Sequence, residues 1–171
     1  QYAGGIVGIY EGNYTNGKIL AACTVQAEGG SITGGAYQGA GCIVGSVGQY
    51  SYVIGCIAHD ITLSIQQNAS LAAIAGVNSG LIYCCLMYNC QADNTYNTGA
   101  VTHRMNYCYY YNVFEQSDQY MKSSLEELSE DSFIHDLNRY IEDLGLFACH
   151  YKASPTPSET GPTIHMKYYY E

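Results

Sequence analysis

The chain has 171 residues, enough for one domain with a sizeable core, and its formal net charge is −9. Only 6 residues are Lys or Arg, which argues against binding to nucleic acid or to an anionic membrane surface, because both need clustered basic side chains. No apolar run approaches the roughly 18 residues that indicate a transmembrane helix, so we expect no membrane insertion.

The start of the chain bears on what kind of polypeptide this is. The chain does not open on a charged segment followed by an apolar one, the pattern of a secretory leader. A repeat begins almost at Gln1. We therefore expect a mature chain or a piece of a longer chain.

An internal repeat organises the first two thirds of the chain. Each copy has a Gly-containing apolar segment, followed by an apolar residue, two spacers and a cysteine. The cysteines are Cys23, Cys56, Cys85 and, in a weaker fourth copy, Cys108. The glycines are Gly8, Gly45, Gly76 and, in the weak copy, Gly99. The interval between successive cysteines shortens along the chain, and so does the interval between successive glycines. Because the two series shorten together, the loops vary in length and the motif does not.

The repeat predicts a mostly β fold. Its apolar pieces are short and are bounded by Gly, Asn, Ser and Gln, which indicates short strands joined by turns. Such strands in copies of roughly 20 to 35 residues predict a short β-solenoid of three to four irregular coils, stacked at about 4.8 Å. The repeat glycines, Gly8, Gly45 and Gly76, would supply the positive φ that sharp corners require. A small antiparallel sandwich with chance similarity between strands is the alternative.

The predicted solenoid repeats occupy residues 1–114. Within them, residues 61–65 alternate apolar and polar side chains, the period of a half-buried strand. Residues 115–148 are expected to form a helical C-terminal cap that covers the open end of the stack, because unpaired strand edges need protection. Residues 149–171 are expected to form a Pro-containing loop and a final strand, 163–170, packed on the same domain and paired with an edge.

Capping signals place the helices of this C-terminal region. Residues 124–127 read Ser-Leu-Glu-Glu, a capping box that begins a short helix. Ser129 is the predicted N-cap of a second helix, and Gly145 is its predicted C′ residue. The apolar residues at helical spacing between them are Phe133, Ile134, Leu137, Ile141 and Leu144.

The 8 cysteines allow two interpretations. An even count permits four disulfides. However, Cys23, Cys56, Cys85 and Cys108 share one repeat position, and cysteines stacked with parallel Cβ vectors fit disulfide geometry poorly. We therefore favour a ladder of reduced, buried thiols with a structural role. Cys84, Cys85 and Cys90 lack the paired C-x₂-C spacing of a zinc site, so we predict no metal and no cofactor.

The sequence assigns no catalytic residue. The 5 histidines are scattered, without the H-E-x-x-H pattern of a metallopeptidase, and the carboxylates of the repeats fall at unrelated repeat positions. The candidate binding residues are tyrosines, of which the chain has 19. Alternate strand residues share a face, so Tyr109 with Tyr111, and Tyr168 with Tyr170, are predicted to form platforms that stack on a sugar or a peptide. The alternative is that these rings cover the ends of the core or pair across strands.

The Gly-Gly-Ile-Val-Gly segment and the apolar-x-x-Cys segment that follows it resemble the GLUG-motif repeat of bacterial cell-surface and secreted proteins. Met121 and the Phe-x-x-x-Leu-Asn pattern that begins at Phe133 are similar to the helix that often closes such arrays. Cys42 stands where the second glycine of the motif is expected, which departs from the pattern.

The GLUG resemblance implies a non-catalytic, extracellular or cell-surface module, either adhesin-like or a spacer, with a glycan or a host surface protein as its partner. The alternative is an accessory substrate-binding region of a secreted hydrolase or peptidase. A small polysaccharide-acting enzyme is a third hypothesis, and it requires carboxylates clustered in a groove.

Overall fold

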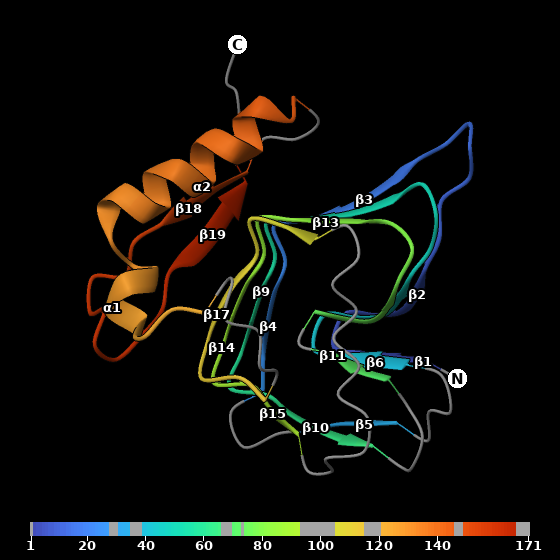
Figure 1. The fold of residues 1–171 in the computed structure, drawn as a ribbon, viewed down its shortest axis with the longest axis horizontal. Coiled ribbons are helices and arrows are strands. Elements are labelled where there is room, and N and C mark those ends of the chain that lie inside the picture. Colours follow the sequence, from blue (N-terminus) through green and yellow to red (C-terminus); the bar gives the residue numbers. More distant parts are fainter. Residues whose placement is uncertain are drawn as a thin grey trace.

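The computed structural model describes residues 2–27, 31–34, 39–65, 70–72, 74–92, 105–114, 121–145 and 149–166. These residues form mostly β structure: short parallel strands up to residue 111, then two helices and a two-stranded antiparallel ribbon (Figure 1). The prediction of a mostly β fold with a C-terminal helix is confirmed.

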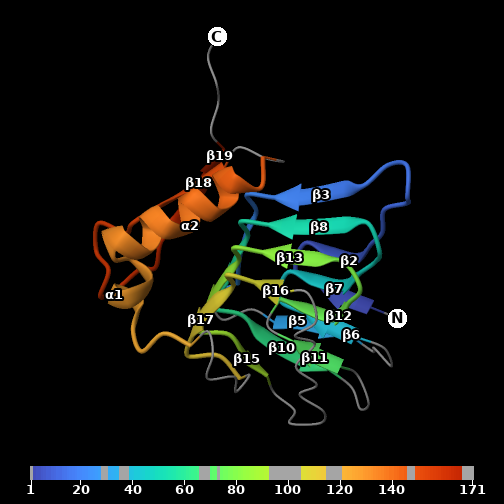
Figure 2. The same cartoon turned by 45° about the horizontal axis from the view of Figure 1, so that its top comes forward.

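Parallel strands build five sheets, each taking one strand from successive traverses of the chain (Figure 2). We call one traverse a pass. Sheet A contains β1 (Tyr2–Gly4), β6 (Gly39–Gly41) and β11 (Ser70–Ala72), and sheet B contains β2 (Val7–Tyr10), β7 (Val44–Val47) and β12 (Ala75–Asn78). Sheet C contains β3 (Lys18–Ala21), β8 (Ser51–Ile54), β13 (Leu81–Tyr83) and β16 (Met105–Asn106). Sheet D contains β4 (Thr24–Gln26), β9 (Ile57–His59), β14 (Leu86–Tyr88) and β17 (Tyr109–Tyr111), and sheet E contains β5 (Ser31–Gly34), β10 (Thr62–Ile65) and β15 (Gln91–Ala92).

The register of these sheets follows the repeat. In sheet C, the apolar residues that open the apolar-x-x-Cys segments pair with one another: Leu20 with Val53, and Ile82 with both Val53 and Met105. In sheet B, the residues directly before the repeat glycines pair in the same way, Val44 with both Val7 and Ala75. All pairings in sheets A to E are parallel, so the antiparallel sandwich alternative is wrong. Parallel pairing in register is compatible with a β-solenoid.

The passes enclose an apolar interior, which we call the inner core. Its buried members are Ala40, Cys42, Ile43, Val44, Val47, Val53, Cys56, Ala58, Ile61, Leu63, Ile74, Ala75, Ile82, Cys85, Met87, Cys90, Cys108 and Tyr110. On the predicted alternating strand, Ile61 and Leu63 are buried while Thr62 and Ser64 are half-buried. The predicted period of two is thus confirmed at these positions.

The expectation that the repeat glycines supply positive φ is wrong. Gly8, Gly45 and Gly76 lie inside strands of sheet B, and the only described glycines with positive φ are Gly55 and Gly145. At Gly76 the reason for glycine is a close approach of sheet A, because a Cβ there would lie 2.1 Å from the backbone nitrogen of Ala40. This glycine lets two backbones touch.

Mostly non-glycine residues make the sharp corners. Between sheets C and D, one residue of each pass has a φ of 50 to 57°: Ala22, Gly55, Cys84 and Tyr107. Directly after the second, third and fourth strands of sheet D, Asp60, Asn89 and Asn112 have a φ of 50 to 54°. Asp and Asn tolerate this left-handed conformation better than most residues. Their side chains also form a ladder, in which Asn89 donates to Asp60 (3.0 Å) and accepts from Asn112 (2.9 Å).

Two helices follow the parallel strands. Helix α1 (Leu125–Leu128) begins at the predicted capping box, where the Ser124 hydroxyl accepts a hydrogen bond from the Glu127 N–H (3.2 Å). Glu130 occupies the N-cap position of helix α2 (Asp131–Asp143) without a capping hydrogen bond from its side chain, so the prediction of Ser129 as the N-cap is wrong: Ser129 instead ends α1. Gly145 follows α2 with a φ of 62°, as predicted for a C′ glycine.

The helices do not cover the end of the stack. They pack with the ribbon β18 (Cys149–Lys152) and β19 (Thr163–Met166) on the outer flank of sheets C and D, across several passes (Figures 1 and 2). The reason is that sheets C and D also turn apolar side chains outward. We call this second cluster the outer core; its buried members are Ile54, Ile57, Cys84, Leu86, Tyr88, Leu125, Leu128, Ile134, Leu137, Ile141, Cys149, Tyr151 and Ile164.

The final strand also pairs differently from expectation. Strand β19 forms an antiparallel pair with β18, a strand that the sequence analysis did not identify, and not with an edge of the repeats. The ribbon is held to the passes by Tyr151, whose hydroxyl donates to the carbonyl oxygen of Cys84 (2.6 Å) and lies 3.4 Å from that of Cys56. Asn138 of α2 holds the ribbon from the other side, through two hydrogen bonds to the Tyr151 backbone.

Candidate functional site

The structure places two of the four predicted binding tyrosines. Tyr109 and Tyr111 share the outward face of β17, while Tyr110 between them is buried. The Tyr109 ring meets Phe133 of α2 edge to face (4.9 Å between centroids), and the Lys122 Nζ lies 5.5 Å from its centroid. Tyr109 is therefore packed against the helix and is not presented as an open platform. Tyr168 and Tyr170 lie outside the described residues.

Tyr109 also lines a hollow of about 270 Å³ with Lys122 and α2. The Lys122 ammonium lies 4.5 Å from the Phe133 centroid, over the ring, and Glu130 and Asp136 line the same hollow. A lysine already occupies the aromatic faces here. The rings of Tyr109 and Phe133 are therefore less available to stack on a ligand than the residues that line the hollow suggest.

The predicted cysteine ladder runs along the corner between sheets C and D. Cys23 is half-buried, and Cys56, Cys85 and Cys108 are fully buried free thiols. Hydrogen bonding to the neighbouring thiol and burial raise the pKa of Cys23. Burial and the adjacent Cys108 raise the pKa of Cys85 well above its usual value. Because the thiolate is the nucleophile and metal ligand, the raised pKa values keep Cys23 and Cys85 in their unreactive thiol form.

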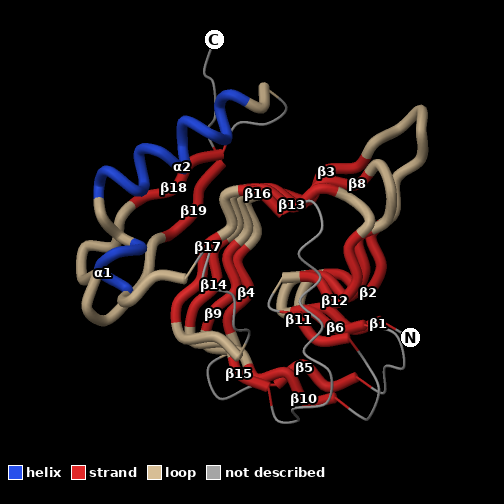
Figure 3. The backbone as a smooth tube through the Cα atoms, in the orientation of Figure 1, coloured by secondary structure: helices blue, strands red, loops and turns tan. Residues whose placement is uncertain are grey.

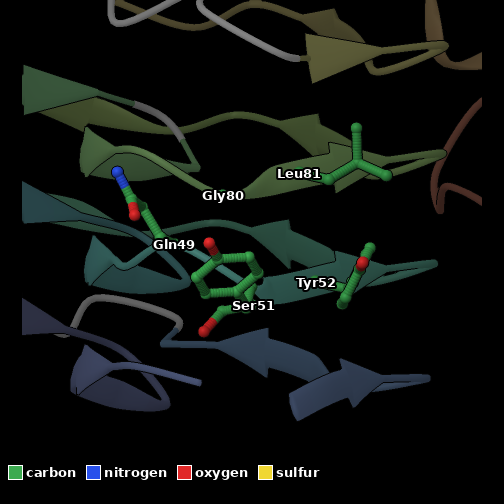
Figure 4. Close-up of a pocket in the computed structure, with 6 residues that line it drawn as sticks. Gln49, Ser51, Tyr52, Gly80 and Leu81 are labelled. Carbon is green, nitrogen blue, oxygen red and sulfur yellow. The ribbon is translucent and has the colours of Figure 1, made fainter. Parts of the chain in front are cut away.

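An open groove lies at the corner between sheets B and C. It has a volume of about 300 Å³ and is lined by Gln49, Tyr50, Ser51, Tyr52, Gly80 and Leu81 (Figure 4). Tyr50 is 44% exposed, and its ring meets that of Tyr14, 84% exposed, edge to face with 5.7 Å between centroids. We call this feature the Tyr50–Tyr52 groove.

Local backbone geometry explains why the groove forms here. Tyr50 has a φ of 59°, and its carbonyl oxygen accepts from the Lys18 N–H (3.1 Å), which fixes the corner against the first pass. Gly80 must lack a side chain, because a Cβ would lie 2.4 Å from the carbonyl oxygen of Ser51. Tyr52 points outward from β8 between Ile19 and Leu81, its register partners in sheet C.

The polar groups of the groove suit a ligand that carries hydroxyl groups. Gln49 supplies an amide that both donates and accepts hydrogen bonds. Ser51 is 1% exposed, and its hydroxyl oxygen has no hydrogen-bond partner among the described residues. Ser51 shares the inward face of β8 with Val53, so its buried hydroxyl is turned away from the groove. Aromatic rings beside a few polar groups are a common way of binding small molecules.

The described residues contain no group of three or more His, Cys, Asp or Glu side chains arranged to hold a metal ion. The two repeat carboxylates among the described residues, Glu11 and Asp60, lie at different corners. Glu11 lies in the loop between β2 and β3, beside Gly48, whereas Asp60 lies at the corner between sheets D and E, 2.7 Å from the Nδ1 of His59. Among the described helices, none is long and apolar enough to cross a bilayer.

Sequence reasoning missed the Tyr50–Tyr52 groove. It weighed clusters of consecutive tyrosines, whereas these two are separated by Ser51 in a sequence that reads Gly-Gln-Tyr-Ser-Tyr. The position of these tyrosines in the repeat was the signal in the sequence that could have indicated the groove. The segment sits at a loop whose length differs between repeats, and unequal loops in stacked copies leave recesses.

Comparisons of this chain with protein families, with curated proteins and with solved structures found no match. The resemblance to the GLUG-motif repeat therefore stays a prediction.

Proposed function

We propose that this chain is a non-catalytic, adhesin-like binding module of a secreted or surface bacterial protein, built on a β-solenoid of GLUG-type repeats. The fold proposal is supported by the repeated order of sheets A to E and by their parallel register. The groove at one corner of the stack is the binding site, and its ligand is a glycan.

The observation that carries the glycan proposal is the composition of the Tyr50–Tyr52 groove. Two tyrosine rings and a glutamine amide line one open recess. Sugar rings combine apolar C–H faces, which pack on aromatic rings, with hydroxyl groups that pair with amides and hydroxyls. The neighbouring Tyr14, on the loop between β2 and β3, extends the aromatic surface beyond the recess.

A thermal-shift screen against polysaccharides and mucin oligosaccharides, followed by calorimetric titration, tests this function. A ligand present at 100 times its dissociation constant should stabilise the native state by about 2.7 kcal/mol. Two variants should weaken that binding about 10-fold or more: Tyr52→Thr, and Tyr50→Asn, in which asparagine suits the left-handed backbone.

Tyr111→Thr is the matched control, because Tyr111 is another half-buried, outward-facing strand tyrosine, on sheet D. If glycan binding survives Tyr52→Thr but is lost in Tyr111→Thr, the groove is not the site and the β17 tyrosines are. If no glycan shifts the melting temperature, the glycan proposal is wrong.

A further inference from the structure

Two aromatic rings on the flank meet at a right angle and hold a cation between them. The rings of Tyr109, on β17, and Phe133, on α2, have an interplanar angle of 86°. The Lys122 Nζ lies over both, 4.5 Å from the Phe133 centroid and 5.5 Å from the Tyr109 centroid. A cation within about 6 Å of a ring centroid is attracted by the negative face of the ring. The two rings are therefore two walls of a site that favours positive charge.

The hollow beside these rings has room for a small ligand. Its volume of about 270 Å³ lies just below the range of about 300–1,000 Å³ that is usual for small-molecule sites. Tyr140 also lines it, but this ring is stacked on Tyr107 (3.8 Å between centroids) and lies under the Arg139 guanidinium (5.0 Å). Tyr140 thus closes the hollow and offers no third aromatic face.

The charged groups around the hollow also favour a cation. Glu130 and Asp136 line it, and Asp136 accepts a hydrogen bond from Arg139 (3.3 Å). The Glu130 side chain makes no capping hydrogen bond to α2. With Asp131 in the first turn, Glu130 offsets the positive end of the helix dipole. A cation in the hollow would therefore meet two ring faces and the Glu130 carboxylate, whereas an anion would be repelled by Glu130.

Lys122 can leave the rings without any change in the backbone. Its N–H donates to the Tyr110 carbonyl oxygen (2.8 Å), which fixes the main chain, while its long aliphatic stem is flexible. Hydrogen bonding from Ser123, together with the nearby Lys122 charge, lowers the pKa of Glu127. Glu127 is thus a second anionic group near enough to attract the Lys122 ammonium once a ligand displaces it.

From these contacts we propose that the hollow between Tyr109 and Phe133 is a second binding site, for a small quaternary ammonium group such as that of choline, and that Lys122 occupies it in the free chain. A quaternary ammonium has no N–H to satisfy, so ring faces and one carboxylate suit it better than they suit the Lys122 ammonium, which has three donors. The site lies on β17 and α2 and shares no lining residue with the Tyr50–Tyr52 groove.

Titration of the whole chain with choline and with tetramethylammonium, followed by NMR of the aromatic rings, tests this site. Both cations should shift the ring signals of Tyr109 and Phe133. Dimethylbutanol, the uncharged isostere of choline, should bind at least about 10-fold more weakly, because the ring faces attract charge. Phe133→Leu keeps an apolar contact with the outer core but removes a ring face, so it should weaken choline binding about 10-fold. Glu130→Gln, at an exposed position, should weaken it several-fold.

Lys122→Met tests whether the lysine competes for the site. Methionine keeps a long, flexible side chain without the ammonium, so choline affinity should rise about 10-fold when the internal competitor is gone. Lys152→Met is the matched control, because it makes the same change in net charge at an exposed position on β18. Its effect on choline affinity should be far smaller, since charges beyond the Debye length are screened.

Four outcomes overturn the proposal. The first is that neither the wild type nor Lys122→Met responds to high millimolar choline. The second is that dimethylbutanol binds as tightly as choline, which would make the hollow merely apolar. The third is that Lys122→Met and Lys152→Met raise the affinity equally, which would be an effect of net charge. The fourth is that Phe133→Leu binds choline as tightly as the wild type. Thermal melting establishes that each variant is folded, and Glu130→Gln decides in place of Phe133→Leu where the latter is not.

Discussion

The inner core and the outer core share one wall and are built differently. Sheets C and D turn Val53 and Ala58 into the inner core, and they turn Ile54 and Ile57 into the outer core, all of them at most 1% exposed. The inner core is closed by repetition, because each pass covers the one before it. The outer core is closed by a unique segment, α1, α2 and the ribbon, that comes later in the chain (Figure 3). The sequence repeat therefore explains the burial of the inward face of sheets C and D, but not the burial of their outward face.

The largest effect should come from a charge placed in the inner core. Val44 is 0% exposed and pairs with strands on both sides, so Val44→Asp buries an unpaired carboxylate and should prevent folding. The control is Ile9→Asp, because Ile9 also lies in sheet B but is 53% exposed. Circular dichroism and thermal melting measure both. A soluble Val44→Asp variant that melts cooperatively would contradict the burial of Val44 in the inner core.

Truncation in the outer core should cost less. Ile141 of α2 is 0% exposed and packs in the outer core, so Ile141→Ala should lower the free energy of unfolding by about 2–5 kcal/mol. His135→Ala, on the exposed face of the same helix, should change it by less than about 0.5 kcal/mol. Urea unfolding measures both values. Equal, small effects would mean that the flank is only loosely attached to the passes.

The pH dependence of stability should give the smallest effect. Burial raises the pKa of Cys149, in the outer core, from 9.0 to about 11. The unfolded state therefore loses this proton first. Below pH 9 the Cys149 thiol is protonated in both the folded and the unfolded state, so it does not reduce the stability of the fold. As the pH rises from 9 toward 11, the thiol ionises in the unfolded state but not in the folded state, and the free energy of unfolding falls. This thiol should contribute up to about 1.4 kcal/mol of lost stability per pH unit in that window.

Cys149→Ala, compared with wild type by urea unfolding at pH 8 and pH 10.5, isolates this contribution. The variant should lose less stability between the two pH values. In the inner core, burial together with Cys108 raises the pKa of Cys85 much further, so its contribution should persist beyond this window. An identical pH profile for wild type and variant would contradict the burial of Cys149.

The inner core was predictable because its determinants are periodic. The spacings of Cys23, Cys56 and Cys85 give the register of sheet C directly, and the alternation of residues 61–65 identifies the buried face of β10. Capping chemistry placed the start of α1 at Ser124, because that signal involves only neighbouring residues.

The outer core and the groove were not predictable in the same way. Nothing local in the sequence shows that Ile54 and Ile57 are covered by a helix that comes much later in the chain, so an end cap was expected in place of a flank. The glycine error has a similar origin. Composition shows where glycine occurs, but only the close approach of Ala40 to Gly76 shows that contact, and not positive φ, requires it.

The loops between sheets B and C shorten from pass to pass, and this has an evolutionary consequence. Residues 11–17 connect β2 to β3, residues 48–50 connect β7 to β8, and residues 79–80 connect β12 to β13. The strands on either side keep their register, so insertions here leave the inner core unchanged. Insertions or deletions at this one corner can change the shape of the Tyr50–Tyr52 groove and the tyrosines beside it while the fold stays the same. Ligand preference is thus free to diverge faster than the scaffold that carries it.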